Sequence, residues 1–305
     1  MRARAGWKLA AGVLAGMYAA VLGAGYLAPY DATEQHREAP LRAPAAMQFE
    51  RGRLVVADAI SGRKVAVHWF SGGHLFGVKA PALYFPLGSD EFGRDQFSRI
   101  LYGGRISLMA ALLGAMVSLG LGLAAGLMSA LGPVWLDAVL MRLGEVCLAL
   151  PWLYLLLGVR AFLPLDLSPE AVFVVFVVLA GMLGWARPAR LFRGLGLSLK
   201  QAGYVEASRG FGASRWYVAR RHMLSELRGV VGTQGALLVP QFLLAEVTLS
   251  LFGLGINEPG VSWGTMLDVV RQPAMLAMNP WLAMPVLVLV PVFLCFQVCA
   301  DAMAR

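Results

Sequence analysis

A run of 31 consecutive residues without a charged side chain, from Ile106 to Leu136, constrains this chain more than any other feature of its sequence. A helix needs about 20 apolar residues to cross the hydrocarbon core of a bilayer. The whole chain is 58% hydrophobic and only 14% charged, whereas soluble domains carry about 25% charged residues. The sequence therefore predicts an integral membrane protein in which Ile106–Leu136 forms one tilted span.

Five further segments predict crossings, at residues 9–30, 141–163, 170–190, 229–251 and 275–300. Basic residues precede the first segment, and Gly23-Ala24-Gly25 is a poor cleavage site, so an uncleaved span with a cytoplasmic N-terminus is favoured over a signal peptide. The segments 141–163 and 170–190 have only 14 and 16 uncharged residues between charges, a length that also suits re-entrant or buried helices. We expect an all-α membrane protein with six transmembrane helices and both termini in the cytoplasm.

One polar segment carries most of the net charge. Nine Lys or Arg residues against two acids, Glu206 and Glu226, lie between Arg187 and Arg228, which is +7 of the chain's +8. Basic loops between spans favour the cytoplasmic side. The segment either contacts another protein or meets lipid headgroups as a solvated basic loop, and charge alone does not separate the two.

The same segment predicts two short helices separated by glycine. Ser198 is a candidate N-cap for a helix over 199–209, Gly210-Phe211-Gly212 should end that helix, and Ser214 is a candidate N-cap for a second helix towards Leu224. The small residues here would let a helix lie close in a groove of a partner, with Phe211 as a hydrophobic plug.

Residues 31–104 differ from the rest in having mixed charge, several prolines and short alternating apolar segments such as 53–56 and 64–70. This pattern predicts a small β-rich element in an extracytoplasmic insertion between the first two spans. It would serve either as a docking surface for an external protein, which we favour, or as a spacer. The domain organisation expected is thus 1–30, the first helix; 31–104, the insertion; and 105–305, a five-helix core that contains the basic segment at 190–228.

The insertion ends in a capped, charge-paired turn before the second span. Asp90, Arg94, Asp95 and Arg99 stand at spacings that allow pairing along a helix. The acids Asp90 and Glu91 have no His or third carboxylate beside them, so ion pairing is favoured over a metal or catalytic site. We refer to seven residues here as the pre-span motif: Gly88, Asp90, Gly93, Arg94, Asp95, Ser98 and Arg99.

Two other features concern helix packing and intramembrane charge. The Gly122-x-x-x-Gly126 pattern predicts a close-packing face, towards either a partner subunit or a neighbouring helix of the same chain. Glu246 lies near the outer end of its span, where a structural role reaching headgroups or capping a turn is favoured over a proton relay or cation site. Trp263 suits the interfacial aromatic belt.

The sequence does not indicate catalysis, metal binding or cofactor binding by this chain. The three cysteines and four histidines form no disulfide or metal-ligand spacing, and no span holds a Ser/His or His/Glu pair, so we expect no metal, no cofactor and no catalytic residues. The phosphate-binding pattern Gly-x-x-x-x-Gly-Lys-Ser/Thr does not occur, so ATP and magnesium would be bound by separate subunits.

Several motifs resemble one family. Glu206-Ala207-Ser208-x-x-x-Gly212 followed by Arg221-His222 resembles the Glu-Ala-Ala loop of ABC-importer permease subunits. The stretch 87–107, and Ala245-Glu246 through Gly253, Gly255 and Ser262-Trp263-Gly264, resemble the C-type subunit of dipeptide, oligopeptide and nickel importers. In this sequence Ser208 replaces the second alanine, Ser225-Glu226 replaces a usual Pro-Asn, and Gly260-Val261 replaces a common Thr-Pro.

The resemblance implies a type I ABC-importer permease fold and a binding-protein-dependent importer in the bacterial inner membrane. It implies a second, non-identical permease, two cytoplasmic ATPases, an extracytoplasmic substrate-binding protein and membrane lipid as partners, and no nucleic acid. The ATPase-coupling residues would be Glu206, Ala207, Ser208, Gly210, Phe211, Gly212 and Arg215, and the outer-gate candidates Glu246, Gly253, Gly255 and Trp263.

Three functions remain open at this stage. Import of di- or oligopeptides is favoured, with nickel or another small solute as the alternative within the family. An ATP-independent secondary transporter belongs to a different class, which usually places ionisable or broken-helix sites near the midplane of repeated halves. No inverted repeat is visible in this sequence.

Overall fold

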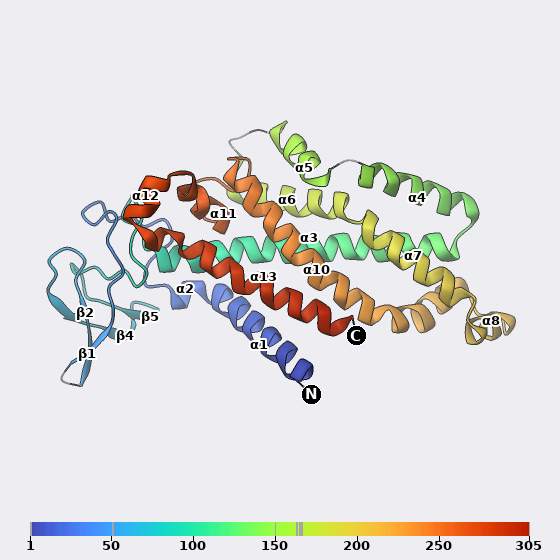
Figure 1. Cartoon of the computed structure of the whole chain (residues 1–305), viewed down its shortest axis with the longest axis horizontal. Helices are drawn as coiled ribbons and strands as arrows, with labels where there is room; N and C mark the ends of the chain where they lie inside the picture. Colours follow the sequence, from blue (N-terminus) through green and yellow to red (C-terminus); the bar gives the residue numbers. More distant parts are fainter. Residues whose placement is uncertain (1, 51, 150, 163, 165–166, 305) are drawn as a thin grey trace. The chain divides into compact units, whose positions relative to one another are not determined.

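The computed structural model describes residues 2–50, 52–149, 151–162, 164 and 167–304. These residues are mostly helical, with five short strands between residues 48 and 77 (Figure 1). The chain divides into two compact units. One comprises Met1–Ala11, Ala110–Ala245 and Cys295–Arg305, and the other comprises Gly12–Met109 and Glu246–Leu294. We call them the first and the second unit.

The second unit contains the strands. After α1 (Arg2–Leu22) and the short α2 (Ala24–Leu27), strands β1 (Gln48–Glu50), β2 (Arg53–Ala57) and β3 (Lys64–Ala66) form an antiparallel sheet in that order. Strands β4 (His68–Ser71) and β5 (His74–Gly77) form a separate hairpin, and Gly72 and Gly73 have the positive φ angles that its turn requires. The β-rich element expected from the alternating segments is therefore present.

A small core holds these strands in place. Val56, Val67, Phe76 and Tyr84 are buried together, and Phe76 also lies near Phe97 of the following helix. Asp58 fixes the turn after β2, because its carboxylate accepts hydrogen bonds from the Ser61 N–H and hydroxyl and from the Leu83 N–H. Burial by itself would raise the pKa of Asp58, but these hydrogen bonds outweigh it and lower the pKa to about 2.

Helix α3 (Gln96–Leu131) begins ten residues before the charge-free run and ends before Pro133, earlier than the expected end at Leu136. In the first unit, its glycine face packs against α7 (Ala186–Lys200). A Cβ atom on Gly122 would lie 2.7 Å from Pro188 Cβ, and one on Gly126 would lie 2.7 Å from Phe192 Cβ. The small-residue pattern therefore serves a neighbouring helix of the same chain.

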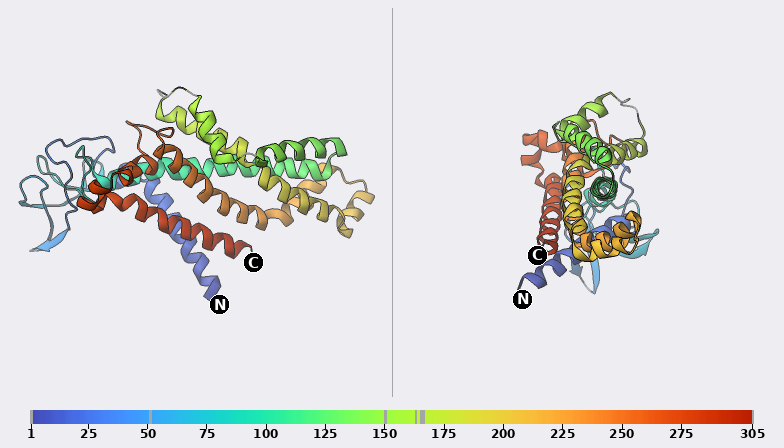
Figure 2. Two further views of the ribbon diagram at one scale, coloured as in Figure 1. Left: turned by 45° about the horizontal axis from the view of Figure 1, so that its top comes forward. Right: turned by 90° about the vertical axis from the view of Figure 1, so that its right-hand side faces the viewer.

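The expected third span is two helices. α4 (Val134–Ala149) and α5 (Trp152–Ala161) flank Pro151, which cannot continue a helix, and the pair bends by more than 40°. The next pair, α6 (Pro169–Gly184) and α7, bends by 41°. Figure 2 shows α4 running beside α7, and Asp137 of α4 forms two hydrogen bonds with Arg193 of α7, at 2.5 and 2.6 Å.

The basic segment is almost entirely helical. It runs through α7, α8 (Gly203–Gly210), α9 (Arg215–Val218) and a π-helical turn, Ala219–Met223, that continues directly into α10 (Leu224–Leu251). The N-cap predicted at Ser198 is wrong, because α7 extends to Lys200 and the first break falls at Gln201 and Ala202. The end of α8 at Gly210 and the N-cap at Ser214 are confirmed.

The remaining segments are short helices followed by one long helix. The order is α11 (Trp263–Met266), a 3₁₀ turn over Leu267–Arg271, α12 (Pro273–Met278), a second 3₁₀ turn over Pro280–Ala283 and α13 (Met284–Met303). Prolines 240 and 291 lie inside α10 and α13 without ending them. In the described part of the chain, three helices are long and apolar enough to cross a membrane, or five if each bent pair counts as one span.

Candidate functional site

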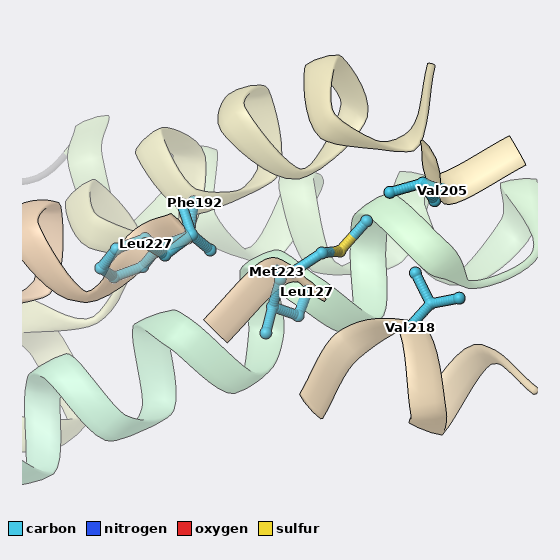
Figure 3. Close-up of a cluster of buried hydrophobic side chains, with 6 residues drawn as sticks. All are labelled: Leu127, Phe192, Val205, Val218, Met223 and Leu227. Atoms are coloured by element: carbon cyan, nitrogen blue, oxygen red, sulfur yellow. The ribbon is translucent and has the colours of Figure 1, made fainter. Parts of the chain in front are cut away.

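Two groups of residues carry the candidate functions: the basic segment in the first unit, and the pre-span motif with its neighbours in the second unit. The part of the basic segment that follows α7 is anchored by apolar side chains. Val205, Val218, Met223 and Leu227 are buried against Leu127 of α3 and Phe192 of α7 (Figure 3). Most other side chains of residues 203–217 are exposed.

The exposed side of the basic segment combines aromatic and cationic residues. Phe211 is 94% exposed and Trp216 is 74% exposed, at and just beyond the break between α8 and α9. Arg209, Arg215 and Arg220 are exposed beside them. Protein-interaction surfaces are enriched in exposed aromatic side chains and arginines. This surface therefore has the properties expected of a docking element.

Local contacts hold the two halves of the segment together. Gly212 has φ +85°, which favours glycine, and the Ser214 hydroxyl accepts a hydrogen bond from the Tyr217 N–H at 3.2 Å. His222 Nε2 lies 3.4 Å from the Ser208 hydroxyl, and its ring packs beside the rings of Tyr204 and Tyr217. Glu206 and Ala207 are exposed on α8, so the predicted coupling residues share one short region.

In the second unit, the pre-span motif is a tight turn. Gly88 and Gly93 have positive φ angles, and a Cβ atom on them would lie 2.6 Å from Arg42 O and 1.9 Å from His36 O. The Asp90 carboxylate accepts hydrogen bonds from the Phe92 and Arg94 N–H groups and from Arg94 Nε at 2.7 Å. The ion pairing expected for Asp90 is confirmed, although it occurs in a turn and not along a helix.

Asp95 does not pair with Arg99 as predicted. Its carboxylate instead accepts hydrogen bonds from the Ser98 N–H at 2.8 Å and the Ser98 hydroxyl at 2.6 Å, which caps α3. Burial raises the pKa of Asp95 to about 7, against the lowering effect of these hydrogen bonds. The spacing of Asp95 and Arg99 suggested a helical pair, but the helix begins only at Gln96.

A partner that sequence reasoning missed is Glu258. Its Oε1 lies 2.8 Å from Arg94 Nη1 and 3.2 Å from Arg99 Nη2. The residues are more than 150 positions apart, and no local pattern joins them. In the first unit, Asp137 and Arg193 form a second ion pair that no local sequence pattern indicates.

Three of the four outer-gate candidates, Glu246, Gly255 and Trp263, are buried, whereas Gly253 is exposed. Trp263 is fully buried, so its expected place in an interfacial belt is wrong; its backbone N–H donates to the Ser107 hydroxyl at 3.0 Å. Gly253, with φ +71°, follows the end of α10, and a Cβ atom on Gly255 would lie 2.1 Å from Ser250 Oγ. These glycines allow the chain to turn closely around the end of α10.

Glu246 is 2% exposed, so the expectation that it reaches lipid headgroups is wrong. The Ser250 hydroxyl donates to its Oε1 at 2.9 Å, and the Ser262 hydroxyl donates to that of Ser250 at 3.3 Å. The carboxyl group is therefore bound within a chain of serine hydroxyls that joins the end of α10 to the start of α11. This arrangement fits the structural role favoured from the sequence.

Comparisons with known proteins agree with these features. Residues 119–305, well over half of the chain, match the family described as the binding-protein-dependent transport system inner membrane component, and the chain belongs to this family. The resemblance drawn from its motifs is therefore confirmed, and the long apolar helices fit a multi-pass inner-membrane component.

Several relatives within this family have names that state what they transport. A putative peptide permease protein of Brucella ovis is 35% identical over 66% of this chain, and the match spans 65% of that relative's length. The oligopeptide transport system permease protein OppC of Haemophilus influenzae is 32% identical over 72% of this chain and 68% of its own. The dipeptide transport system permease protein DppC of Bacillus subtilis is 34% identical over 59% of this chain and 55% of its own.

A solved structure shows the fold. The MetNI methionine ABC transporter in an inward-facing conformation contains a chain that superimposes with a TM-score of 0.52 at 16% identity, covering 68% of this chain and 98% of that one. The fold is therefore that of a type I ABC-importer permease.

Proposed function

We propose that this chain is a permease subunit of an ATP-driven, binding-protein-dependent importer of di- and oligopeptides. Family membership supports the transport class, and the names of the relatives, peptide, oligopeptide and dipeptide permeases, support the cargo. The same names favour peptides over nickel or another small solute.

The observation that carries the proposal is the exposed aromatic and basic surface around Phe211 and Arg215, on a segment anchored at its other side. In this proposal the surface docks in a groove of a cytoplasmic ATPase, so that ATP-driven closure of two such ATPases moves the attached helices. The chain itself supplies binding and transmission, not hydrolysis. Alternating access to the two sides of the membrane follows from that movement.

The working complex would contain a second, non-identical permease, two ATPases and an extracytoplasmic substrate-binding protein. We propose six spans with both termini in the cytoplasm: α1, α3, the α4–α5 pair, the α6–α7 pair, α10 and α13. This assignment puts the part of the basic segment between α7 and α10 inside and the strands outside. The insertion would then face the substrate-binding protein.

The test is uptake of a labelled dipeptide into vesicles that contain the assembled complex. Uptake should cease when ATP is depleted while an imposed ion gradient is held constant, and the ATPases should co-purify with this chain. Uptake that follows the ion gradient without ATP would support a secondary transporter and overturn the proposal. Labelling of the segment 204–226 from the outside of intact cells would overturn the topology.

A further inference from the structure

The second unit contains a cavity of about 440 Å³ next to the pre-span motif. It lies between the start of α3, the end of α10 and the segments that follow α10. Its wall includes the two buried arginines of the motif, Arg94 and Arg99, and the polar side chains of Ser250, Asn257 and Gln272. This volume lies within the range of sites that bind small organic ligands, roughly 300–1,000 Å³.

Both arginines point to a single carboxylate oxygen. Arg94 Nη1 and Arg99 Nη2 lie 2.8 and 3.2 Å from Glu258 Oε1. The arginine side chains are only 7% and 4% exposed, whereas the Glu258 side chain is 52% exposed. The cationic side of this contact is therefore fixed in the protein, and the carboxylate is its accessible member.

The groups around the two arginines do not accept hydrogen bonds from all of their N–H donors. Asp90 accepts a hydrogen bond from Arg94 Nε at 2.7 Å but lies 3.7 Å from Arg99 Nε. Arg99 Nη1 is buried and has no hydrogen-bond partner among the described residues. A buried guanidinium with an unpaired donor has capacity for one more acceptor.

We propose that this cavity is a carboxylate-binding site of the transport path, in which Glu258 occupies the position that the C-terminal carboxylate of a peptide takes when the peptide is bound. The inference rests on the proposed function, because it assigns a peptide as the ligand. Paired guanidinium groups match the geometry of a carboxylate and form strong, charge-assisted hydrogen bonds with it.

Exchange of one carboxylate for another keeps the local charge unchanged. Among the described residues, Asp90 is the other carboxylate that pairs with these two buried guanidinium groups. Without Glu258, one of the two buried charges would be uncompensated, which is unfavourable. A peptide carboxylate in the position of Glu258 restores the balance. The amide groups of a short peptide could then bond to Asn257 and Gln272.

The test measures binding of a labelled dialanine peptide, and of its C-terminal amide, to the complex of both permeases and ATPases in nanodiscs, without ATP and without the substrate-binding protein. The free-carboxylate peptide should bind at least about tenfold more tightly than the amide, since the amide loses charge-assisted hydrogen bonds. Glu258→Gln should tighten binding of the free-carboxylate peptide several-fold, because it removes the competing carboxylate. Arg99→Gln should abolish the preference for the carboxylate.

Glu145→Gln is the matched control, since the Glu145 side chain is about as exposed as that of Glu258 and pairs with Arg142, but it does not line the cavity; it should leave both affinities unchanged. Equal binding of the peptide and its amide would overturn the site. So would a Glu258→Gln variant that melts at a lower temperature with unchanged affinity, because Glu258 would then only fasten its loop. Uptake in vesicles, measured in parallel, separates the two proposals: ATP-driven uptake with no carboxylate preference overturns only the site.

Discussion

The indole N–H of Trp263 donates a hydrogen bond to the carbonyl oxygen of Ile100 at 2.9 Å, across 163 positions of sequence. Ile100 lies in the first turns of α3, and Trp263 begins α11. The ring fits there because Gly104 has no side chain: a Cβ atom at that position would lie 2.7 Å from Trp263 Cζ2 and 2.8 Å from Val21 Cγ1. A buried tryptophan thus fixes the short helices after α10 to the start of α3.

Gly104→Ala should destabilise the protein by about 1–3 kcal/mol, because the added methyl group overlaps with two packed side chains. The measurement is the melting temperature in detergent. Gly120→Ala is the control in the same helix, where a Cβ atom meets no neighbour within 4 Å, and it should be neutral or stabilising by up to about 1 kcal/mol. Equal melting temperatures of the two variants would contradict the close packing at Gly104.

Phe211→Ala should leave the melting temperature unchanged, because the side chain is 94% exposed. Removal of a central aromatic contact from an interface costs about 2 kcal/mol or more, so ATPase binding should weaken by roughly 30-fold. The measurement is co-purification and titration of the ATPase, with Phe162→Ala as control because Phe162 is 93% exposed elsewhere. Unchanged ATPase affinity in the Phe211 variant would count against docking at this residue.

Gly212→Ala and Gly210→Ala form a matched pair. A Cβ atom meets nothing within 4 Å at either position, but only Gly212 has a positive φ angle, +85°. Alanine at Gly212 should therefore cost about 1–2 kcal/mol in backbone strain and reduce both ATPase binding and uptake. Alanine at Gly210 should support normal uptake, and equal loss in both variants would show that backbone conformation is not the cause.

Asp58→Asn should show a pH-dependent loss of stability. The pKa of Asp58 in the folded protein, about 2, lies below its ordinary value of 3.8. The ionised carboxylate therefore stabilises the fold above about pH 4, by about 2 kcal/mol, and that contribution disappears as the pH falls towards 2. Wild-type and variant should differ at pH 6 and converge near pH 2 in hydrogen exchange of β2 and β3. A difference independent of pH would contradict the assignment.

Glu246→Gln should retain transport at pH 6 and pH 8, since the amide oxygen can still accept the hydrogen bond from Ser250. Glu246→Ala should lower the melting temperature by removing that acceptor from the buried serine hydroxyls, a loss of about 1–3 kcal/mol. The measurements are uptake for the Gln variant and the melting temperature for the Ala variant. Loss of uptake in a stable Gln variant would indicate that the carboxyl group carries a proton.

The sequence was most informative where structure is local. Gly210 as the end of a helix, Ser214 as an N-cap and the strands near residues 53–56 and 64–70 depend on backbone preference and neighbouring residues, and all were predicted. Ser198 was misassigned because a serine can equally stand inside a helix, and α7 continues past it to Lys200.

Contacts between distant segments could not be predicted. Glu258 lies in a loop, and no sequence pattern relates it to Arg94 or Arg99. Trp263 is of a residue type that is common at membrane interfaces, although it is fully buried. The burial of Glu246 likewise depends on serines from α10 and α11 that meet only in the fold. The sequence therefore predicts candidate site residues, but it does not predict most of the residues that they contact.

The π-helical turn, the Ser214 cap and the buried anchors Val205, Val218 and Met223 have a consequence for assembly. They leave the exposed surface around Phe211 already shaped before any other subunit arrives. A partner that binds a preorganised surface does not have to freeze a flexible one, so more of the contact energy appears as affinity. Association of the subunits should then be fast, and its rate should not change with agents that promote helix formation, because the helices are already formed.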